Sequence, residues 1–159
     1  MSHDHVRIAV IDADPPGSEH VPARRVGDAE WEIIRSPLYA TEVASGDVIK
    51  VTNAETGSFE IIRRGGNICA QLYLSEDKAD DARFTSNLAE EIGELIEPLN
   101  GRVDAITAGL ISLTIPAASG FQAIEGVLEV AVGRCPGSQW QYANVYDSVT
   151  GEPLGWWNE

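Results

Sequence analysis

Residues 67–74, NICAQLYL, and residues 80–99, DDARFTSNLAEEIGELIEPL, decide the fold of this chain. The first stretch alternates apolar residues with others from Ile68 to Leu74, the period of a strand with one buried face. In the second stretch, leucine and isoleucine recur at steps of three and four from Leu88 to Leu99. This spacing predicts a helix with one apolar stripe.

The residues after this helix complete a recognisable order of elements. Residues 102–107 and 110–115 predict a hairpin, residues 119–132 a second helix, and residues 139–147 a last strand. Strand, helix, strand, strand, helix, strand is the order of the ferredoxin-like fold. We therefore expect both helices on one face of a four-stranded antiparallel sheet.

The first 66 residues predict strands alone. Five short β-type runs, at 6–13, 20–26, 30–35, 48–52 and 59–64, are separated by turn-forming residues. Short strands joined by tight turns are typical of a small barrel or a strongly curled sheet. With a boundary at the paired glycines 65–66, the prediction is an α+β chain with a barrel-like module (1–66), a ferredoxin-like acidic module (67–147) and a C-terminal tail (148–159).

The net charge of the chain limits the classes of molecule that it can bind. The chain has 159 residues, with 25 acids, 11 bases and a net charge of −14. Residues 1–66 carry −4 and residues 67–159 carry −10. Such a charge repels nucleic acid and anionic lipid and attracts basic protein surfaces.

The chain also lacks patterns for export or membrane insertion. No apolar run approaches the roughly 20 residues of a membrane span, and the N-terminus lacks the order of a signal peptide. Two cysteines, Cys69 and Cys135, fit reduced thiols in a cytosol. A cytoplasmic protein with no membrane contact is therefore expected.

The predicted helices explain where the negative charge lies. Four glutamates of the first helix and two of the second occupy the sides away from the apolar stripes, and further acids crowd the start of the first helix, where they suit its dipole. We expect these acids to merge into one surface for a basic partner; plain solvation or salt adaptation are the alternatives. The predicted partner-binding residues are Asp77, Asp80, Glu90, Glu91, Glu94, Glu97, Glu125 and Glu129.

No pattern predicts catalysis, a metal or a cofactor. All three histidines, His3, His5 and His20, lie in the first twenty residues, away from the acidic module. Cys135 precedes a proline in a predicted loop with only Arg134 as a nearby cation, which favours an inert thiol.

The last strand offers a second kind of site. Its larger residues, among them Trp140 and Tyr142, alternate with smaller ones. If the smaller residues face the helices, the aromatic rings lie on the open face of the sheet. That face would be covered by the first module or by the Trp156-Trp157 tail, act as a protein-binding hot spot, or wall a cleft for a small molecule. The cleft residues of this alternative are Tyr73, Trp140, Tyr142 and Tyr146.

Residues 36–40 (SPLYA), 46–51 (GDVIKV) and 59–67 (FEIIRRGGN) resemble an uncharacterised bacterial family, the domain of unknown function numbered 4265. The resemblance covers about residues 28–147. It departs from the family pattern at Cys69 and Gln71, where a threonine and an arginine would stand. The resemblance implies an architecture and carries no activity.

These observations favour a non-enzymatic acidic binding protein. In its most specific form it is an immunity-type inhibitor that neutralises a basic toxin, such as a nuclease. The alternatives are a small-molecule-binding or enzymatic domain that uses the cleft, and a self-associating adaptor. The sequence does not predict the oligomeric state.

Overall fold

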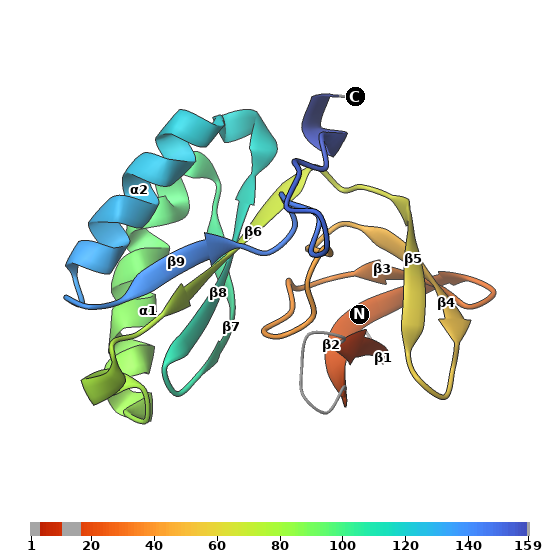
Figure 1. Ribbon diagram of the computed structural model, residues 1–159, viewed down its shortest axis with the longest axis horizontal. Helices are drawn as coiled ribbons and strands as arrows, with labels where there is room; N and C mark the ends of the chain where they lie inside the picture. Colours follow the sequence, from red (N-terminus) through yellow and green to blue (C-terminus); the bar gives the residue numbers. More distant parts are fainter. Residues whose placement is uncertain (1–3, 11–16, 159) are drawn as a thin grey trace.

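A computed structural model describes residues 4–10 and 17–158 (Figure 1). It contains two antiparallel sheets and two α-helices, which confirms the predicted mixed α+β class. The elements of the first sheet are β1 (Asp4–Val10), β2 (Gly17–Gly27), β3 (Glu30–Ile33), β4 (Val48–Asn53) and β5 (Ser58–Arg63). Those of the second part are β6 (Asn67–Tyr73), α1 (Ala82–Ile96), β7 (Arg102–Thr107), β8 (Leu110–Pro116), α2 (Phe121–Gly133) and β9 (Gln139–Tyr142).

The first sheet is a meander in which each strand pairs with the next, from β1 to β5. The described strands do not close into a barrel, because no ladder joins β5 to β1. The two ends nevertheless meet at one point, where the Ala9 N–H donates to the Gly57 carbonyl at 2.9 Å. β-branched residues such as Ile8, Val21 and Ile49 fill the concave side of this sheet.

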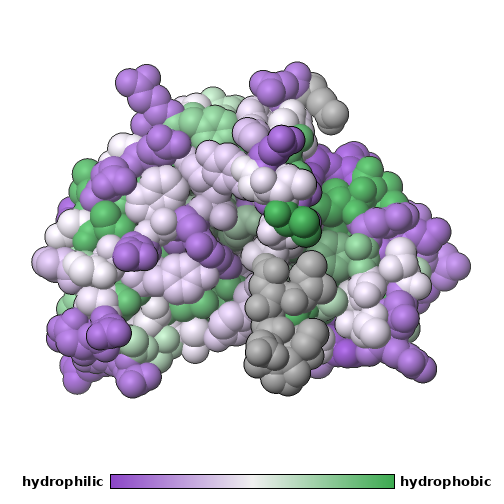
Figure 2. All heavy atoms as spheres, in the orientation of Figure 1, coloured by the Kyte–Doolittle hydropathy of each residue, from purple (hydrophilic) through white to green (hydrophobic). Residues whose placement is uncertain are grey.

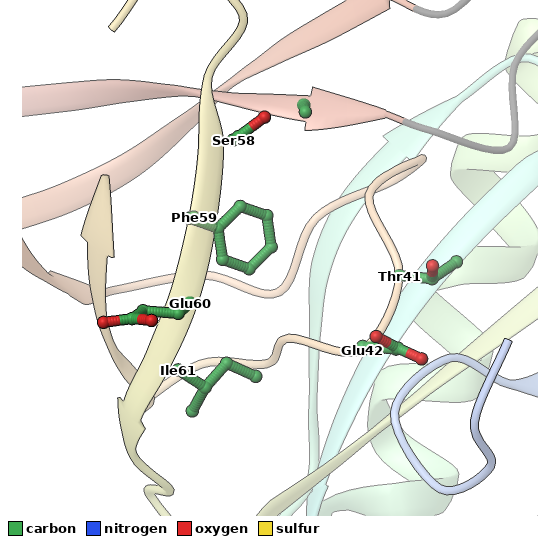
Figure 3. A pocket seen from close by; sticks show the side chains of 7 residues that line it. Thr41, Glu42, Ser58, Phe59, Glu60 and Ile61 are labelled. Atoms are coloured by element: carbon green, nitrogen blue, oxygen red, sulfur yellow. The ribbon is translucent and has the colours of Figure 1, made fainter. Parts of the chain in front are cut away.

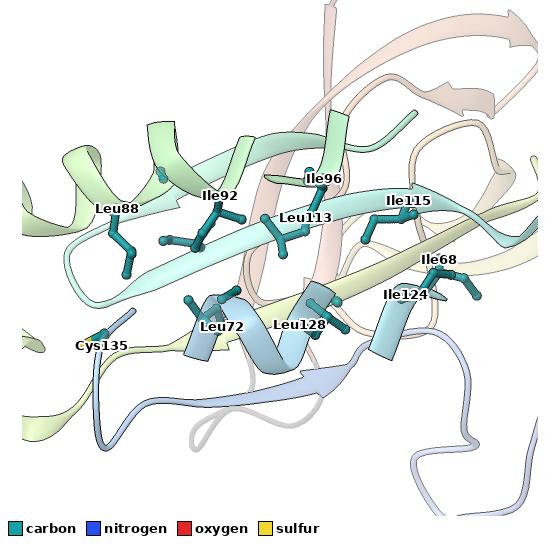
Figure 4. Close-up of a cluster of buried hydrophobic side chains, with 14 of the residues drawn as sticks. Ile68, Leu72, Leu88, Ile92, Ile96, Leu113, Ile115, Ile124, Leu128 and Cys135 are labelled. Atoms are coloured by element: carbon teal, nitrogen blue, oxygen red, sulfur yellow. The ribbon is translucent and has the colours of Figure 1, made fainter. Parts of the chain in front are cut away.

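The second sheet has the strand order β7-β8-β6-β9, and every neighbouring pair is antiparallel. α1 and α2 cover the face that points away from the first sheet (Figure 1). Figure 4 shows Leu88, Ile92 and Ile96 of α1 packed toward the leucines and isoleucines of β6, β8 and α2. Burying each such side chain contributes about 1.5–3 kcal/mol, so the apolar stripes hold both helices on the sheet.

α1 is shorter than the predicted helix because both of its ends are capped. Asp81 accepts the N–H of Phe84 at 2.9 Å, so the helix begins at Ala82. At the other end a 3₁₀ turn leads to Asn100, whose left-handed backbone (φ 61°) stops the chain.

The last strand ends at Tyr142, earlier than predicted. After one more backbone bond, from the Ala143 N–H to the Cys69 carbonyl, a side chain replaces the pairing: Asn144 accepts the Cys69 N–H at 2.8 Å and donates to the Asn67 carbonyl at 2.9 Å. The alternation of strand residues therefore breaks here, and Val145 turns into the core between sheet and helices.

Two glycines meet where the chain enters β4 and leaves β5. Gly46 and Gly65 lie backbone against backbone, and a Cβ on Gly65 would stand 2.3 Å from the Gly46 carbonyl carbon. Only glycine fits at position 65 without pushing these two backbone segments apart. Among the described residues, no helix is long and apolar enough to span a bilayer.

Candidate functional site

The outer side of α1, together with the 3₁₀ turn that follows it (Glu97–Leu99), carries a row of exposed carboxylates. Glu90, Glu94 and Glu97 are all exposed, and none of them forms an ion pair with a described residue. Asp77 and Asp80 are exposed just before the helix begins. α1 thus presents several uncompensated negative charges along its length.

The acids of α2 do not join this row, and the expectation of one merged surface is wrong. The Glu125 carboxylate accepts the Tyr142 hydroxyl at 2.9 Å, and that of Glu129 accepts the Trp140 indole N–H at 3.0 Å. Both glutamates therefore lie on the β9 side of α2, whereas Glu90 borders β7. β7 and β9 are opposite edges of the sheet. The reason is the position of the apolar stripe, which places these two glutamates at the flank of α2.

Glu91 differs from the other acids of α1. Its carboxylate pairs with Arg134 at 3.1 Å, and about half of each side chain is exposed. Exposed pairs of this kind contribute at most about 1 kcal/mol. Glu91 therefore faces α2 and a cation, which weakens it as a contact for a basic partner.

The predicted aromatic cleft is not formed. Trp140 lies opposite Leu72 and Tyr142 opposite Ala70, so both rings are on the helix face of β9, not on its open face. Burial, together with the hydrogen bond to Glu125, raises the pKa of the Tyr142 hydroxyl. Tyr146 is half exposed and lies 6.3 Å from Tyr142, ring centre to ring centre.

Tyr73 remains on the other face, which is covered by the first part of the chain, as one of the alternatives predicted. The covering segment is residues 34–47, between β3 and β4. The Ser112 hydroxyl donates to the Pro37 carbonyl at 2.9 Å and the Gln71 amide to that of Leu38 at 2.5 Å. This segment covers most of the open face, and a hollow of about 230 Å³ remains beside it, lined in part by Tyr39, Gln71, Tyr73 and Gln141.

One carboxylate is at the centre of this contact. Asp104 accepts the Ser36 N–H at 2.8 Å, the Thr114 hydroxyl at 2.5 Å and the Arg102 Nε–H at 2.6 Å. Arg102 also donates to the Ser45 hydroxyl. Every buried side-chain N or O of the described residues has a hydrogen-bond partner. Asp104 and these partners form a polar seam that joins the two sheets. None of its buried polar groups lacks a partner, so none is available to bind a ligand or substrate.

A second buried carboxylate, Asp47, holds the turn that leads into β4. It accepts the N–H groups of Ala44 and Gly65 and lies 3.3 Å from Arg64. Burial raises the pKa of Asp47, against the opposing effect of these donors. The carboxylate is enclosed, so its role is to fix the backbone.

The thiols and histidines form no catalytic arrangement among the described residues. Cys69 and Cys135 are both buried and unpaired with each other. His5 and His20 lie on β1 and β2 of the first sheet, Cys69 lies on β6 and Cys135 follows α2, while His3 is outside the described residues. No three potential ligands among residues 4–10 and 17–158 are placed to hold a metal ion.

Two hollows lie beside β5. The first, about 310 Å³, is shown in Figure 3: Phe59 and Ile61 point from β5 toward the loop that carries Thr41 and Glu42, while Glu60 points away. The Glu42 carboxylate accepts the Ser148 N–H at 2.9 Å, which ties this loop to the C-terminal segment. The exposed surface of the hollow is mainly apolar.

The second hollow is a groove of about 790 Å³ between β5, the start of α2 and the C-terminal segment. This groove was not predicted, because its walls come from three segments that are far apart in the sequence. The adjacent pairs Arg63-Arg64 and Trp156-Trp157 were the features of the sequence that could have pointed to it. The lining residues are Ile61, Ile62, Arg63, Arg64, Gly66, Ala117, Ala118, Phe121, Trp156 and Trp157.

Comparisons with known proteins give a family and a related fold. A family model described as Domain of unknown function (DUF4265) matches residues 19–134. The chain is similar in structure to a hypothetical protein from Neisseria gonorrhoeae, with a TM-score of 0.65, 15% identity, and coverage of 90% of this chain and 95% of that chain. At this identity the likeness concerns the fold alone. No curated protein sequence matches the chain.

Proposed function

The chain belongs to the DUF4265 family, whose function is unknown, and we propose that it is a non-enzymatic binding protein whose helix α1 docks against a basic protein partner. The observation that carries this proposal is the row Glu90, Glu94 and Glu97. These residues are exposed and have no cationic partner among the described residues.

The spacing of the row strengthens the proposal. Residues three and four apart are neighbours on a helix surface, and like charges there cost about 0.2–0.5 kcal/mol per pair. The repulsion between Glu90 and Glu94 is relieved when a cation approaches both. This spacing destabilises the free protein slightly, and the release of that repulsion adds to the free energy of binding a basic partner.

The remaining acids act at longer range. Asp77 and Asp80 lie at one end of α1, and Glu125 and Glu129 lie on the β9 flank of the helix layer. Charges around a binding surface increase the rate of encounter with an oppositely charged partner more than they increase affinity. We assign steering to these four residues and direct contact to the row on α1.

In its finer form the proposal is an immunity-type inhibitor. We infer a ferredoxin-like module at 67–147, supported by the strand order β7-β8-β6-β9 with both helices on one face, next to a curled β module at 1–66. A toxin that cleaves nucleic acid has a cationic active site, because its substrate is a polyanion. A row of carboxylates on a rigid helix is complementary to such a site.

The test is charge reversal with a matched control. The variant Glu90→Lys/Glu94→Lys/Glu97→Lys is compared with Glu55→Lys/Glu60→Lys/Glu152→Lys, which makes the same change of net charge at exposed positions elsewhere. Partners captured from host extract by the wild type are purified and titrated at two salt concentrations. We expect the α1 variant to bind at least about tenfold more weakly at low salt, with a flatter salt dependence.

The control variant should keep most of the affinity. If both triple variants bind equally, only the net charge matters and α1 is not the contact surface. If the α1 variant binds as the wild type does, the proposal is wrong. A second candidate function, small-molecule binding, is favoured by the groove beside β5.

A further inference from the structure

The groove between β5 and the C-terminal segment combines aromatic walls with positive charge. Its lining includes two arginines and no carboxylate, in a chain of net charge −14. In Figure 2 a hydrophobic surface lies near the upper end of β5, beside the C-terminal segment. Ile62, which lines the groove, is 49% exposed.

One wall of the groove is rigid before any ligand binds. Arg64 donates to the Glu42 carbonyl at 2.6 Å, pairs with Asp47, and lies over the Trp156 ring at 5.4 Å. The Trp156 indole N–H in turn donates to the Asn144 carbonyl at 2.9 Å. These contacts fix Arg64 and Trp156, so the wall loses little conformational entropy on binding.

The aromatic side of the groove is also ordered by ring contacts. Trp157 meets Phe121 edge to face at 5.1 Å and Trp156 at 5.4 Å. Trp157 is only partly buried, so one part of its ring remains open to the groove. An exposed indole next to apolar side chains suits a planar or apolar group.

Arg63 provides the charge. Its side chain makes no hydrogen bond or ion pair with a described residue and the residue is exposed, unlike Arg64, whose charge is compensated by Asp47. An arginine with free donors beside an apolar wall can pair with carboxylate, sulfonate or phosphate oxygens.

We propose that this groove binds a small amphipathic anion, with its acidic group at Arg63 and its aromatic or apolar body against Ile62 and Trp157. The volume of the groove lies within the range of about 300–1,000 Å³ typical of small-molecule sites. The site is on another part of the surface from the glutamates of α1, so the two proposals stand or fall separately.

The experiment uses the fluorescent dye anilinonaphthalene sulfonate as an aromatic anion, and phenylnaphthylamine as its uncharged counterpart. Each dye is titrated into the full-length protein and into three variants. Arg63→Gln removes the charge, Ala118→Trp fills the groove from an exposed position, and Arg83→Gln removes an exposed arginine from α1 as a control. Circular dichroism checks that each variant is folded.

We expect saturable binding of the sulfonate dye at one site. Arg63→Gln should weaken it about tenfold, the loss of a charge-assisted contact, and leave the uncharged dye unaffected. Ala118→Trp should abolish binding of both dyes, and Arg83→Gln should change neither. The proposal is overturned if Arg63→Gln behaves like Arg83→Gln, if Ala118→Trp still binds, or if the wild type shows no saturable binding.

Discussion

The thiol of Cys69 shows how far one residue's chemistry is set by its place between the sheets. The side chain is fully buried and lies 3.6 Å from the Ser112 hydroxyl. Its backbone N–H is bound by Asn144, and its carbonyl accepts the Ala143 N–H at 2.8 Å. Burial raises the pKa of Cys69 to about 12, so the thiol is protonated at any physiological pH.

We expect Cys69 to resist alkylation in the native protein. The thiolate is the reactive form, and at pH 8 a group with this pKa is ionised in about one molecule in ten thousand. Iodoacetamide labelling followed by peptide mass spectrometry measures this directly. The same treatment in urea should label Cys69 fully, and native labelling at the rate seen in urea would contradict the prediction.

At the scale of elements, the start of α1 is held by one side chain. Asp81 accepts the Phe84 N–H, which has no partner within the helix. Replacing such a cap by alanine typically costs about 0.5–2 kcal/mol. We therefore expect Asp81→Ala to lower the free energy of unfolding by about 1 kcal/mol, measured by urea denaturation.

Asp80→Ala is the matched control, because Asp80 is an exposed acid one residue earlier that caps nothing in the described structure. It removes the same charge from the same end of the helix. Equal losses from the two variants would mean that the charge near the helix dipole, and not the cap, stabilises α1.

The period of the hydrophobic residues and the positions of turn-forming residues were sufficient to predict most helices and strands. Among the described residues, α1, α2 and the nine strands lie where the sequence places them, with ends that differ by a few residues. Residues 11–13 of the first predicted strand lie outside the described residues. The cleft alternative depended on the smaller residues of β9 facing the helices, and the structure has the opposite orientation. A period of two separates the residues of a strand into two sets without saying which set is inside. In the predicted strand 139–147 both sets contain apolar residues, Ala143 and Val145 in one and Trp140 and Tyr142 in the other, so the pattern did not fix which set faces the helices.

The candidate surfaces were harder to predict than the elements. The glutamates were assigned to the solvent side of their helices, which is where they lie. Whether Glu90 and Glu129 lie near each other depends on how each helix is rotated about its axis on the sheet. The sequence of neither helix specifies that rotation. The groove beside β5 depends on segments more than fifty residues apart along the chain, such as 61–64 and 117–121.

At the scale of the whole molecule, polar contacts join the two sheets. Asp104 on β7 binds Ser36, from the segment 34–47, and Thr114 on β8 at the same time. On the other side of that segment, the Glu19 carboxylate of β2 accepts the N–H groups of Leu38, Tyr39 and Ala40. The segment is thus bound to both sheets, and its order depends on both.

This arrangement predicts that a substitution in the polar seam destabilises both sheets. Asp104→Ala leaves the Ser36 N–H, the Thr114 hydroxyl and the Arg102 guanidinium without their acceptor. Removing one partner of a buried charged pair typically costs about 3–5 kcal/mol; because Arg102 is half exposed, we expect about 3 kcal/mol. Asp104→Asn keeps an acceptor and should cost less.

Hydrogen exchange of individual amides distinguishes coupled from separate sheets. If the seam couples them, Asp104→Ala should reduce the protection of the slowest amides of β3 and of β8 by the same factor, roughly a hundredfold, because both then exchange through one global unfolding. Asp28→Ala, at a fully exposed carboxylate, should change neither. Loss of protection in β8 with β3 unchanged would show that the first sheet is stable on its own, and that the polar seam only docks two independent modules.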